Sequence, residues 1–449
     1  MKKQILTVLF LMCSVALLPS QEVKNVILCI GDGMGVGPIT ITRVVKLGVG
    51  GKLNMEKLPV VGLVRTHSDD NAVTDSAAAG TAIATGFKTY NRMIGVTSDG
   101  TSPETLVEFF KKKKMATGII TTNDVYDATP AAFYAHVAAR SSRDIIVTQL
   151  ADKDIDVVLG GGRTWFLPDG VEKGRRKDNR NIIDEMKSKG YTYVSNKTEL
   201  LNARNAKKLV GIFYDYAMNY VIDKEELNIV DVEPTISEMT SVALDVLAKN
   251  KHGFFLMVEG AKIDYAAHAA DIAGVVAETF AFDEAVGVCY EFAKNRDDTL
   301  LIITADHDTM GISLSEPFDY ESLKMITASP EYMVTQFKKD ESGVYTSDSI
   351  KEAVQQYTTV VDNLTDSEIK SIQDTSREYP YKTGWIVGSI IAERLNVAIM
   401  SDSVRQKSQT GGHTGNIVPL FAYGPQSGLF DGYIDNTEIS TIITTRILK

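Results

Sequence analysis

Apolar residues along the chain form short, nearly continuous runs, separated by longer stretches with helical periodicity. Between the runs lie stretches such as ISEMTSVALDVLAKN and AGVVAETFAFDEAVGVCYEFAKN. Apolar strands that alternate with helices indicate a parallel sheet covered on both faces. We therefore expect an α/β fold, a three-layer sandwich whose central sheet is largely parallel. The runs predict strands at Val26–Ile30, Ala116–Thr122, Asp156–Gly160, Phe254–Gly260, Thr299–Ala305 and Pro419–Gly424.

The pattern changes between Gly311 and Val404. Four helix-period stretches follow one another there, and none of the segments between them is a strong strand candidate. We interpret 311–404 as a largely helical insertion within one catalytic domain that spans 21–449. The glycine-rich loop QTGGHTG then leads back into the last predicted strand.

The N-terminal segment MKKQILTVLFLMCSVALLPSQ differs from the rest of the chain. Two lysines precede an apolar core of about 15 residues and a small-residue exit near Ser20, which is typical of a secretory signal peptide over residues 1–20. We expect an exported protein, periplasmic or secreted, with no membrane span after signal removal. Cys13 lies inside the apolar run instead of at its end, which disfavours a lipid anchor.

Composition and charge narrow the function classes. The chain has 449 residues, 44% of them hydrophobic and 23% charged, as in soluble globular proteins. Removing the signal peptide with Lys2 and Lys3 takes the net charge from −11 to −13, because that segment carries no acid. Such a charge argues against nucleic-acid binding. Cys29 and Cys289 lie in apolar patterns and predict buried thiols, and the basic stretch Lys173–Arg180 predicts a solvated loop.

Ser76 opens the small-residue stretch SAAAGTAIATG, and two interpretations of it compete. Serine and aspartate are common helix N-caps, so Ser76 could simply cap a tightly packed helix. As a nucleophile it lacks a neighbouring histidine, and the Gly-x-Ser-x-Gly elbow of hydrolases is absent. A nucleophilic Ser76 therefore needs an activator from elsewhere in the chain.

Acidic residues and histidines gather where the predicted strands end. In an open α/β sheet, ligands bind beyond the carboxyl ends of the strands. A helical turn with an acid and a histidine four residues apart, and a histidine on the glycine-rich loop, complete the set. The candidates are Asp32, Asp127, Thr129, Glu259, Asp264, His268, Asp306, His307 and His413.

Each element has a structural alternative. GDGMGVG could cradle a phosphate, although Val36 occupies the last glycine position of Gly-x-Gly-x-x-Gly. Asp264 and His268 could form a surface pair, and ADHD could cap a helix. Jointly, these residues offer histidine and carboxylate ligands for zinc, and carboxylate and hydroxyl ligands for magnesium. A zinc ion beside Ser76 would supply the missing activation.

Six motifs in order make the chain resemble the alkaline phosphatase family from about Val26 to the C-terminus. They are GDGMG, TDSAAAGTAIATGFKT, DATPAAFYAHVAAR, VEGAKIDYAAH, TADHD and TGGHTG. The resemblance implies hydrolysis of phosphate monoesters to an alcohol and inorganic phosphate through a phosphoserine intermediate. It also implies two zinc ions and one magnesium ion as cofactors.

The resemblance further assigns roles to individual positions. Ser76 matches the nucleophile, and Arg140 matches the guanidinium that binds two phosphate oxygens. The implied ligands are Asp264, His268 and His413 for the first zinc, Asp32, Asp306, His307 and the Ser76 oxygen for the second, and Asp32, Thr129 and Glu259 for magnesium.

Two positions vary within the family. We expect Asp127 to act through magnesium-bound waters, and Tyr265 to shape phosphate affinity and product release. Regions such as 311–404 form a crown or a dimer contact in this family, so a homodimer is compatible with the sequence. The competing functions are a related metal-dependent phosphodiesterase or sulfatase and a non-catalytic phosphate-binding metalloprotein. Against a sulfatase, Ser76 lacks the Cys/Ser-x-Pro-x-Arg flank.

Overall fold

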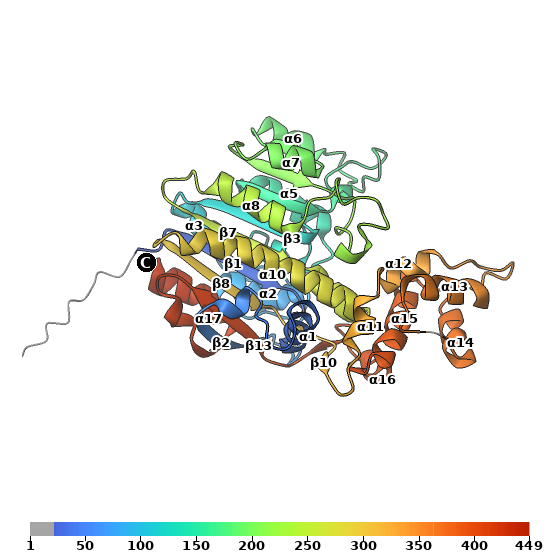
Figure 1. Ribbon diagram of the computed structural model, residues 1–449. Coiled ribbons are helices and arrows are strands. Elements are labelled where there is room, and N and C mark those ends of the chain that lie inside the picture. Colours follow the sequence, from blue (N-terminus) through green and yellow to red (C-terminus); the bar gives the residue numbers. More distant parts are fainter. Residues whose placement is uncertain (1–21, 362, 449) are drawn as a thin grey trace, which may run out of the picture.

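A ten-stranded sheet forms the centre of the protein (Figure 1), seen in a computed structural model that describes residues 22–361 and 363–448. The predicted signal peptide, 1–20, and Cys13 lie outside the described residues. In sheet order the strands are β14 (Gly432–Asp435), β2 (Val60–Arg65), β13 (Val418–Tyr423), β8 (Thr299–Ala305), β1 (Asn25–Gly31), β7 (Phe254–Gly260), β3 (Ala116–Asp124), β4 (Val157–Gly161), β6 (Leu209–Ile212) and β5 (Thr192–Val194).

Every neighbouring pair in this sheet is parallel except the two pairs that contain β13. The largely parallel α/β sandwich is therefore confirmed, and the last predicted strand runs against the others. All six predicted strands are present. Strands β2, β5, β6 and β14, which the apolar runs did not predict, extend the sheet at its two sides.

Helices cover both faces of the sheet. Phe254 packs against Phe292 of α10, and the next residue, Phe255, packs against Phe110 of α3 and against Phe133. Successive strand residues point to opposite faces, so α10 and α3 lie on opposite sides of β7. The helices outside the insertion are α1 (Val36–Leu47), α2 (Ser76–Thr85), α3 (Leu106–Lys112), α4 (Ala128–Ala132), α5 (Arg143–Lys153), α6 (Ile182–Ser188), α7 (Lys197–Asn202), α8 (Ile236–Leu247), α9 (Lys262–His268), α10 (Ile272–Lys294) and α17 (Asn436–Thr441).

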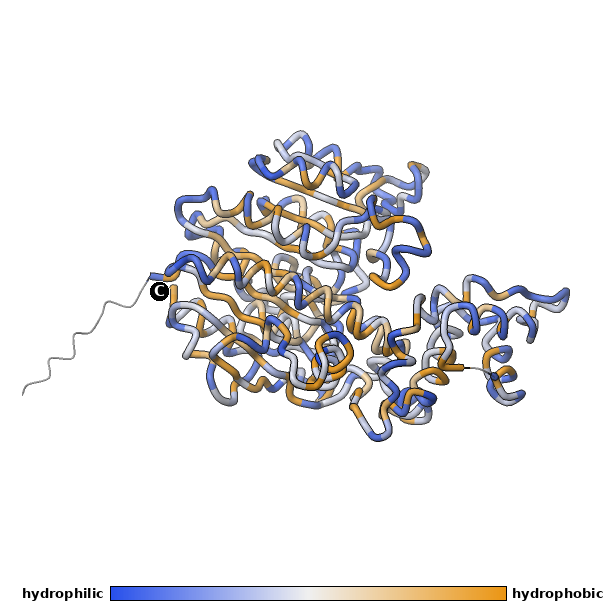
Figure 2. The backbone as a smooth tube through the Cα atoms, in the orientation of Figure 1, coloured by the Kyte–Doolittle hydropathy of each residue, from blue (hydrophilic) through white to orange (hydrophobic). Residues whose placement is uncertain are grey.

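The hydrophobic core follows the sheet. In Figure 2 hydrophobic positions run along the strands in the middle of the molecule, whereas hydrophilic positions dominate the outer turns. Strands β1, β7 and β8 are buried along their whole length. Fully buried strands of this kind form a rigid frame, so side chains at their ends have fixed positions.

The predicted insertion is largely helical and projects to one side of the sheet (Figure 1). A two-stranded antiparallel pair, β10 (Ser313–Leu314) with β11 (Val397–Ala398), joins its two ends. The apolar side chains of the insertion form a second core with α1, α9 and α10. The insertion therefore packs directly on the helix that follows β7. Its helices are α11 (Tyr320–Lys324), α12 (Pro330–Thr335), α13 (Ser347–Tyr357), α14 (Asp366–Asp374), α15 (Pro380–Arg394) and α16 (Asp402–Arg405).

Two further predictions concern the cysteines and the basic loop. Cys29 and Cys289 are buried free thiols, as expected. The basic loop Lys173–Arg180 is largely exposed, as predicted, with the exception of Arg176, which is only 1% exposed. Its guanidinium donates to the Asp178 carboxylate and to the carbonyls of Asp144 and Trp165.

Among the described residues, none of the helices has both the length and the apolar character needed to cross a bilayer.

Candidate active site

Four adjacent strands in the middle of the sheet, β8, β1, β7 and β3, carry the predicted acidic residues at their carboxyl ends. Asp32 directly follows β1, and Asp306 directly follows β8. Glu259 is the penultimate residue of β7 and pairs in register with Ile30 of β1. The parallel register therefore places three carboxylates from distant parts of the sequence at one edge.

The turn after β1 packs closely against this carboxylate cluster. Gly33 has φ of +68°, and a Cβ there would lie 2.8 Å from both Asp264 Oδ1 and Thr309 Oγ1. Its amide donates to Asp306 Oδ1 at 3.1 Å. Glycine is thus needed for backbone conformation and for close approach. The turn amide faces a carboxylate, which disfavours the alternative of a phosphate-cradling turn.

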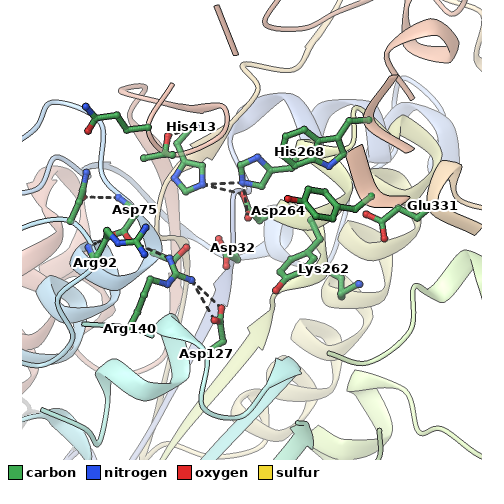
Figure 3. A pocket seen from close by; sticks show the side chains of 17 residues that line it. Asp32, Asp75, Arg92, Asp127, Arg140, Lys262, Asp264, His268, Glu331 and His413 are labelled. Atoms are coloured by element: carbon green, nitrogen blue, oxygen red, sulfur yellow. Dashed lines mark hydrogen bonds and ion pairs between the residues drawn. The ribbon is translucent and has the colours of Figure 1, made fainter. Parts of the chain in front are cut away.

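The remaining candidate ligands come from two elements above this edge. Asp264 and His268 lie on α9, which begins two residues after β7. His413 lies on β12 (His413–Thr414), which pairs with β9 (Asp308–Thr309) directly after β8. Figure 3 shows Asp264, His268 and His413 turned toward one another, with Asp32 below them.

Ser76 is the first residue of α2, and its hydroxyl is not the helix cap. The cap is Asp75, whose side chain accepts a hydrogen bond from the Ala78 amide. Ser76 Oγ instead lies 3.2 Å from His307 Nε2 and is almost fully buried. The fold therefore brings a histidine to Ser76 that the local sequence does not provide.

Two groups of ligand atoms converge beside this serine. In the first, Nε2 of His268 lies 3.1 Å from Nε2 of His413 and 3.2 Å from Asp264 Oδ2. In the second, Nε2 of His307 lies 3.3 Å from both Asp32 Oδ1 and Asp306 Oδ2. Histidine nitrogens and carboxylate oxygens that face one another at such distances could hold a metal ion, and they are the ligand types that zinc prefers. The two groups also approach each other, because His307 and His413 are stacked with ring centroids 3.7 Å apart.

The outer nitrogen of each of these histidines contacts an oxygen atom. Nδ1 of His268 faces the Gly411 carbonyl at 3.0 Å, and Nδ1 of His413 faces the Thr74 carbonyl at 2.9 Å. A carbonyl only accepts, so in neutral imidazole the proton resides on Nδ1 and the Nε2 lone pair faces the cluster. This arrangement is characteristic of metal-ligating histidines.

Buried oxygens without a partner mark a third position. Within residues 22–361 and 363–448, neither carboxylate oxygen of Glu259 has a hydrogen-bond partner, nor does Thr129 Oγ1 on α4, and both residues are fully buried. Leaving such groups unpaired in the interior is costly. Carboxylate and hydroxyl oxygens suit a magnesium ion, so the residues present fit the implied cofactor.

Burial and mutual repulsion control the protonation of this cluster. Burial, with repulsion from neighbouring carboxylates, raises the pKa of Asp306 to about 7 and that of Glu259 to about 8. The pKa of Asp32 is raised for the same reasons. Burial lowers the pKa of His307 to about 4. Bound cations would counter the rise in the carboxyl pKa values, since they stabilise carboxylates, and they would add to the lowering at His307, since they ligate neutral histidine.

Arg140 lies beside the cluster and is held by two carboxylates. Its guanidinium pairs with Asp75 at 3.2 Å and with Asp127 at 3.3 Å. Asp127 accepts a further hydrogen bond from Asn123, and the Tyr265 hydroxyl donates to Asn123. These contacts fix the planar guanidinium at the serine's side of the site, in a position suited to a phosphate group.

A cavity of about 510 Å³ opens over these residues (Figure 3). Ser76, Arg140 and four of the predicted ligands, Asp32, Asp264, His268 and His413, line it on one side. The sequence analysis did not identify several other lining residues, including Arg92, Lys262, Glu331, Tyr381 and Trp385. Lys262 lies within the motif VEGAKIDYAAH, two residues before Asp264, whereas the local sequence of the other four gives no sign of proximity to the site. Glu331, Tyr381 and Trp385 come from the insertion, which therefore forms one wall of the cavity.

Comparisons with known proteins agree with this geometry. The family model for alkaline phosphatase matches residues 23–448. Alkaline phosphatase 3 of Bacillus subtilis is 36% identical over 440 residues, which cover 93% of this chain and 88% of that protein. The alkaline phosphatase of Escherichia coli is 35% identical over 336 residues, 65% of this chain and 71% of that protein.

Solved structures give the same result. The crystal structure of Thermus thermophilus alkaline phosphatase matches with a TM-score of 0.81 and 28% identity, over 94% of this chain and 91% of that one. The cold-active alkaline phosphatase of a Shewanella species matches with a TM-score of 0.79 and 30% identity, over 95% and 100% of the two chains. The fold, the acidic and histidine residues at the strand ends and these similarities show that the chain belongs to the alkaline phosphatase family.

Proposed function

We propose that this enzyme hydrolyses phosphate monoesters through a phosphoserine intermediate on Ser76. One observation carries the proposal. The Ser76 hydroxyl lies beside His307, whose ring joins two groups of convergent ligand atoms. A serine hydroxyl at such a position can become a nucleophile without a general base next to it in the sequence.

The cofactors of the proposal are two zinc ions and one magnesium ion. Asp264, His268 and His413 would hold one zinc ion, Asp32, Asp306 and His307 the other, and Asp32, Thr129 and Glu259 the magnesium ion. Bound there, the cations would lower the pKa of the Ser76 hydroxyl and offset negative charge on the phosphoryl group. The two sets that contain histidine suit zinc, and the all-oxygen set suits magnesium.

The protein's own groups account for the remaining steps. Ser76 Oγ would bond to phosphorus as the phosphorus–oxygen bond to the alcohol breaks. Water would then cleave the new bond, which restores the serine hydroxyl and releases inorganic phosphate. Arg140 would donate two parallel N–H groups to the phosphoryl oxygens, and the first turn of α2 would add backbone N–H groups.

Two polar side chains would tune this reaction. Asp127 pairs with Arg140, so phosphate binding would have to exchange part of that ion pair. Tyr265 would act through Asn123 on the same carboxylate. We infer that this chain of contacts sets phosphate affinity and product release, with magnesium-bound waters as the bridge from Asp127.

Location and assembly are also part of the proposal. The basic and apolar N-terminal segment supports export to the periplasm or the medium. The acidic net charge of −11 argues against nucleic-acid partners. The projecting insertion supports a homodimer contact.

A comparison of Ser76→Ala with wild type tests the proposal. A phosphate monoester, a phosphate diester and a sulfate ester are offered to metal-loaded enzyme. Ser440→Ala, another buried serine, serves as the control for folding. We expect dominant monoester turnover by wild type and by the control, and a loss of at least about 1,000-fold in Ser76→Ala. Equal or faster diester or sulfate turnover by wild type would favour the related esterases. A metal-loaded but inert wild type would favour a phosphate-binding metalloprotein.

A further inference from the structure

Arg92 occupies an unusual backbone conformation beside the candidate site. Its φ is +76°, in the left-handed region that favours glycine. An L-residue with a long side chain holds this conformation at a cost of about 1 kcal/mol or more. Strained residues of this kind persist where the surroundings fix them, and they cluster at ligand-binding sites.

Hydrogen bonds of the Arg92 backbone fix it to the phosphate end of the cavity. Its amide donates to Asp75 Oδ1 at 3.1 Å, and its carbonyl accepts from the Arg140 amide at 2.9 Å. Asp75 is also the cap of α2 and an ion-pair partner of Arg140. The loop that carries Arg92 is therefore positioned by the same groups that position Ser76 and Arg140.

The Arg92 side chain is exposed and lines the cavity. Figure 3 shows Arg92 and Arg140 on the same side of the cavity, beside Asp75. Within the described chain, the Arg92 guanidinium has no hydrogen bond, ion pair or aromatic contact, whereas Arg140 pairs with two carboxylates. A guanidinium offers five N–H donors in a planar fork that matches carboxylate and phosphate groups. Arg92 thus presents a complete set of donors to a ligand.

The size and charge of the cavity indicate which part of a substrate reaches Arg92. Its volume of about 510 Å³ lies within the range of roughly 300–1,000 Å³ that is typical of sites for whole small molecules. A transferred phosphate fills only the end near Ser76, so the alcohol half of the ester occupies the rest. Asp75, Asp127 and Glu331 also line the cavity and repel a second anion there. Arg92 opposes that repulsion.

We propose that Arg92 is a specificity residue that binds a second anionic group in the alcohol half of the substrate. This inference rests on the proposed phosphomonoesterase function and deepens it. The preferred substrates are phosphate monoesters whose alcohol carries a carboxylate or a further phosphate. The Arg92 fork binds that second group while Arg140 binds the reacting phosphate.

Matched substrate pairs test the proposal in the metal-loaded enzyme. Glycerol 3-phosphate and 3-phosphoglycerate differ by one carboxylate, as do phenyl phosphate and 4-carboxyphenyl phosphate. For each variant, kcat/KM is measured for both members of a pair. The compared quantity is kcat/KM for the ester with the carboxylate divided by kcat/KM for the ester without it. Differences in leaving-group reactivity are the same for every variant, so they cancel when variants are compared. Arg92→Gln should lower this ratio about tenfold in at least one pair, and Arg92→Lys should retain part of it.

Two further variants separate contact from general effects. Arg377→Gln removes another exposed arginine that does not line the cavity, and it should leave the ratio within about twofold of wild type. Arg92→Gly removes both the charge and the backbone strain, so it should lower the ratio while the melting temperature stays level or rises.

Three outcomes would decide against the proposal or its basis. An equal fall in kcat/KM for both members of each pair with Arg92→Gln would place Arg92 on the reacting phosphate and overturn the proposal. An unchanged ratio in both pairs would show that the guanidinium contacts no second anion, and would overturn it too. A wild-type enzyme without turnover of any monoester would instead refute the proposed function itself.

Discussion

Ser76 Oγ and His307 Nε2 lie 3.2 Å apart, although 231 positions separate the two residues in the chain. In a Ser-His-Asp triad the carboxylate contacts Nδ1, on the far side of the ring from the serine. Here Asp32 and Asp306 both approach Nε2, the same nitrogen that faces Ser76. Two carboxylates, a serine oxygen and one histidine nitrogen that converge in this way surround a point suited to a cation. The pair is therefore interpreted as two ligands and not as a nucleophile with its base.

Removal of divalent cations separates these two interpretations. Treatment with excess EDTA should lower monoester turnover by at least about 100-fold, because Ser76 then has no group that lowers the pKa of its hydroxyl. It should also lower the melting temperature, since bound ions stabilise the folded state. Zinc together with magnesium should restore both quantities. Full turnover by a protein shown by elemental analysis to be metal-free would establish a metal-independent serine–histidine mechanism.

Thr309 should control metal affinity from outside the ligand set. Its hydroxyl donates to Asp264 Oδ1 at 2.5 Å and faces His307 Nδ1 at 3.3 Å. Thr309→Val keeps the shape and removes both contacts, so we expect a loss of about 10- to 100-fold in zinc affinity. The measurement is activity titrated against buffered free zinc. Thr309→Ser keeps the hydroxyl and should titrate like wild type. Identical zinc titrations for the valine variant and wild type would disprove this role.

Arg140 should require a planar guanidinium. Lysine retains the charge but cannot donate two parallel hydrogen bonds, so Arg140→Lys should lower kcat/KM for monoesters by about 100-fold. The inhibition constant of inorganic phosphate should rise in the same variant. Arg163→Lys offers a control, because Arg163 is also a partly buried, ion-paired arginine, which donates two hydrogen bonds to Asp215 Oδ1 away from the cavity. A lysine variant with wild-type phosphate affinity would contradict the proposed role of Arg140.

A half-buried pair away from the site should give stability a defined pH dependence. The Glu108 carboxylate lies 3.1 Å from Nε2 of His136, and this hydrogen bond raises the pKa of His136. Burial tends to raise the pKa of Glu108, but hydrogen bonds from His136 and Lys153 outweigh it and hold that pKa well below its usual range. The histidine contribution is complete below the unfolded pKa of about 6.5 and is lost as pH rises through the higher folded value. The glutamate contribution is present above about pH 4.3 and is lost in acid.

Glu108→Gln should accordingly cost about 1–3 kcal/mol of unfolding free energy near pH 6 and less near pH 9. Denaturant unfolding of the metal-loaded protein at both pH values measures this difference. Glu104→Gln, which removes an exposed partner of Lys112, should have little effect at either pH. A cost for Glu108→Gln that is the same at pH 6 and pH 9 would show that His136 does not contribute its charge.

The sequence predicted the middle of the fold better than its edges. Continuous apolar runs identify β1, β7 and β8 because both faces of these strands are buried. Strand β2 escaped detection because Gly62 interrupts its apolar residues, and its exposed Val61 and Leu63 show that these residues do not mark a fully buried strand. The direction of β13 was also beyond local patterning, because pairing partners decide it. Local sequence therefore finds the central strands and leaves the outer strands and the strand directions open.

The candidate site shows a similar division. Because the carboxyl ends of parallel strands share one edge, the position of each acid after a strand was enough to group Asp32, Glu259 and Asp306. Contacts between residues far apart in the sequence were not predicted. Examples are the hydrogen bonds from the Arg176 guanidinium to two backbone carbonyls, and those of the Thr309 hydroxyl with Asp264 and His307. The contribution of the insertion to the cavity wall was not predicted for the same reason. Sequence patterns reveal ligand types, while supporting contacts require the fold.

The most direct test of the account locates the phosphoryl group during turnover. Metal-loaded enzyme is mixed with a phosphate monoester, quenched rapidly in acid and mapped by mass spectrometry, with Ser76→Ala treated in parallel. The account predicts one phosphorylated site, Ser76, in wild type and none in the variant. Phosphate on any other residue, or turnover without acid-stable covalent phosphate on the protein, would contradict it.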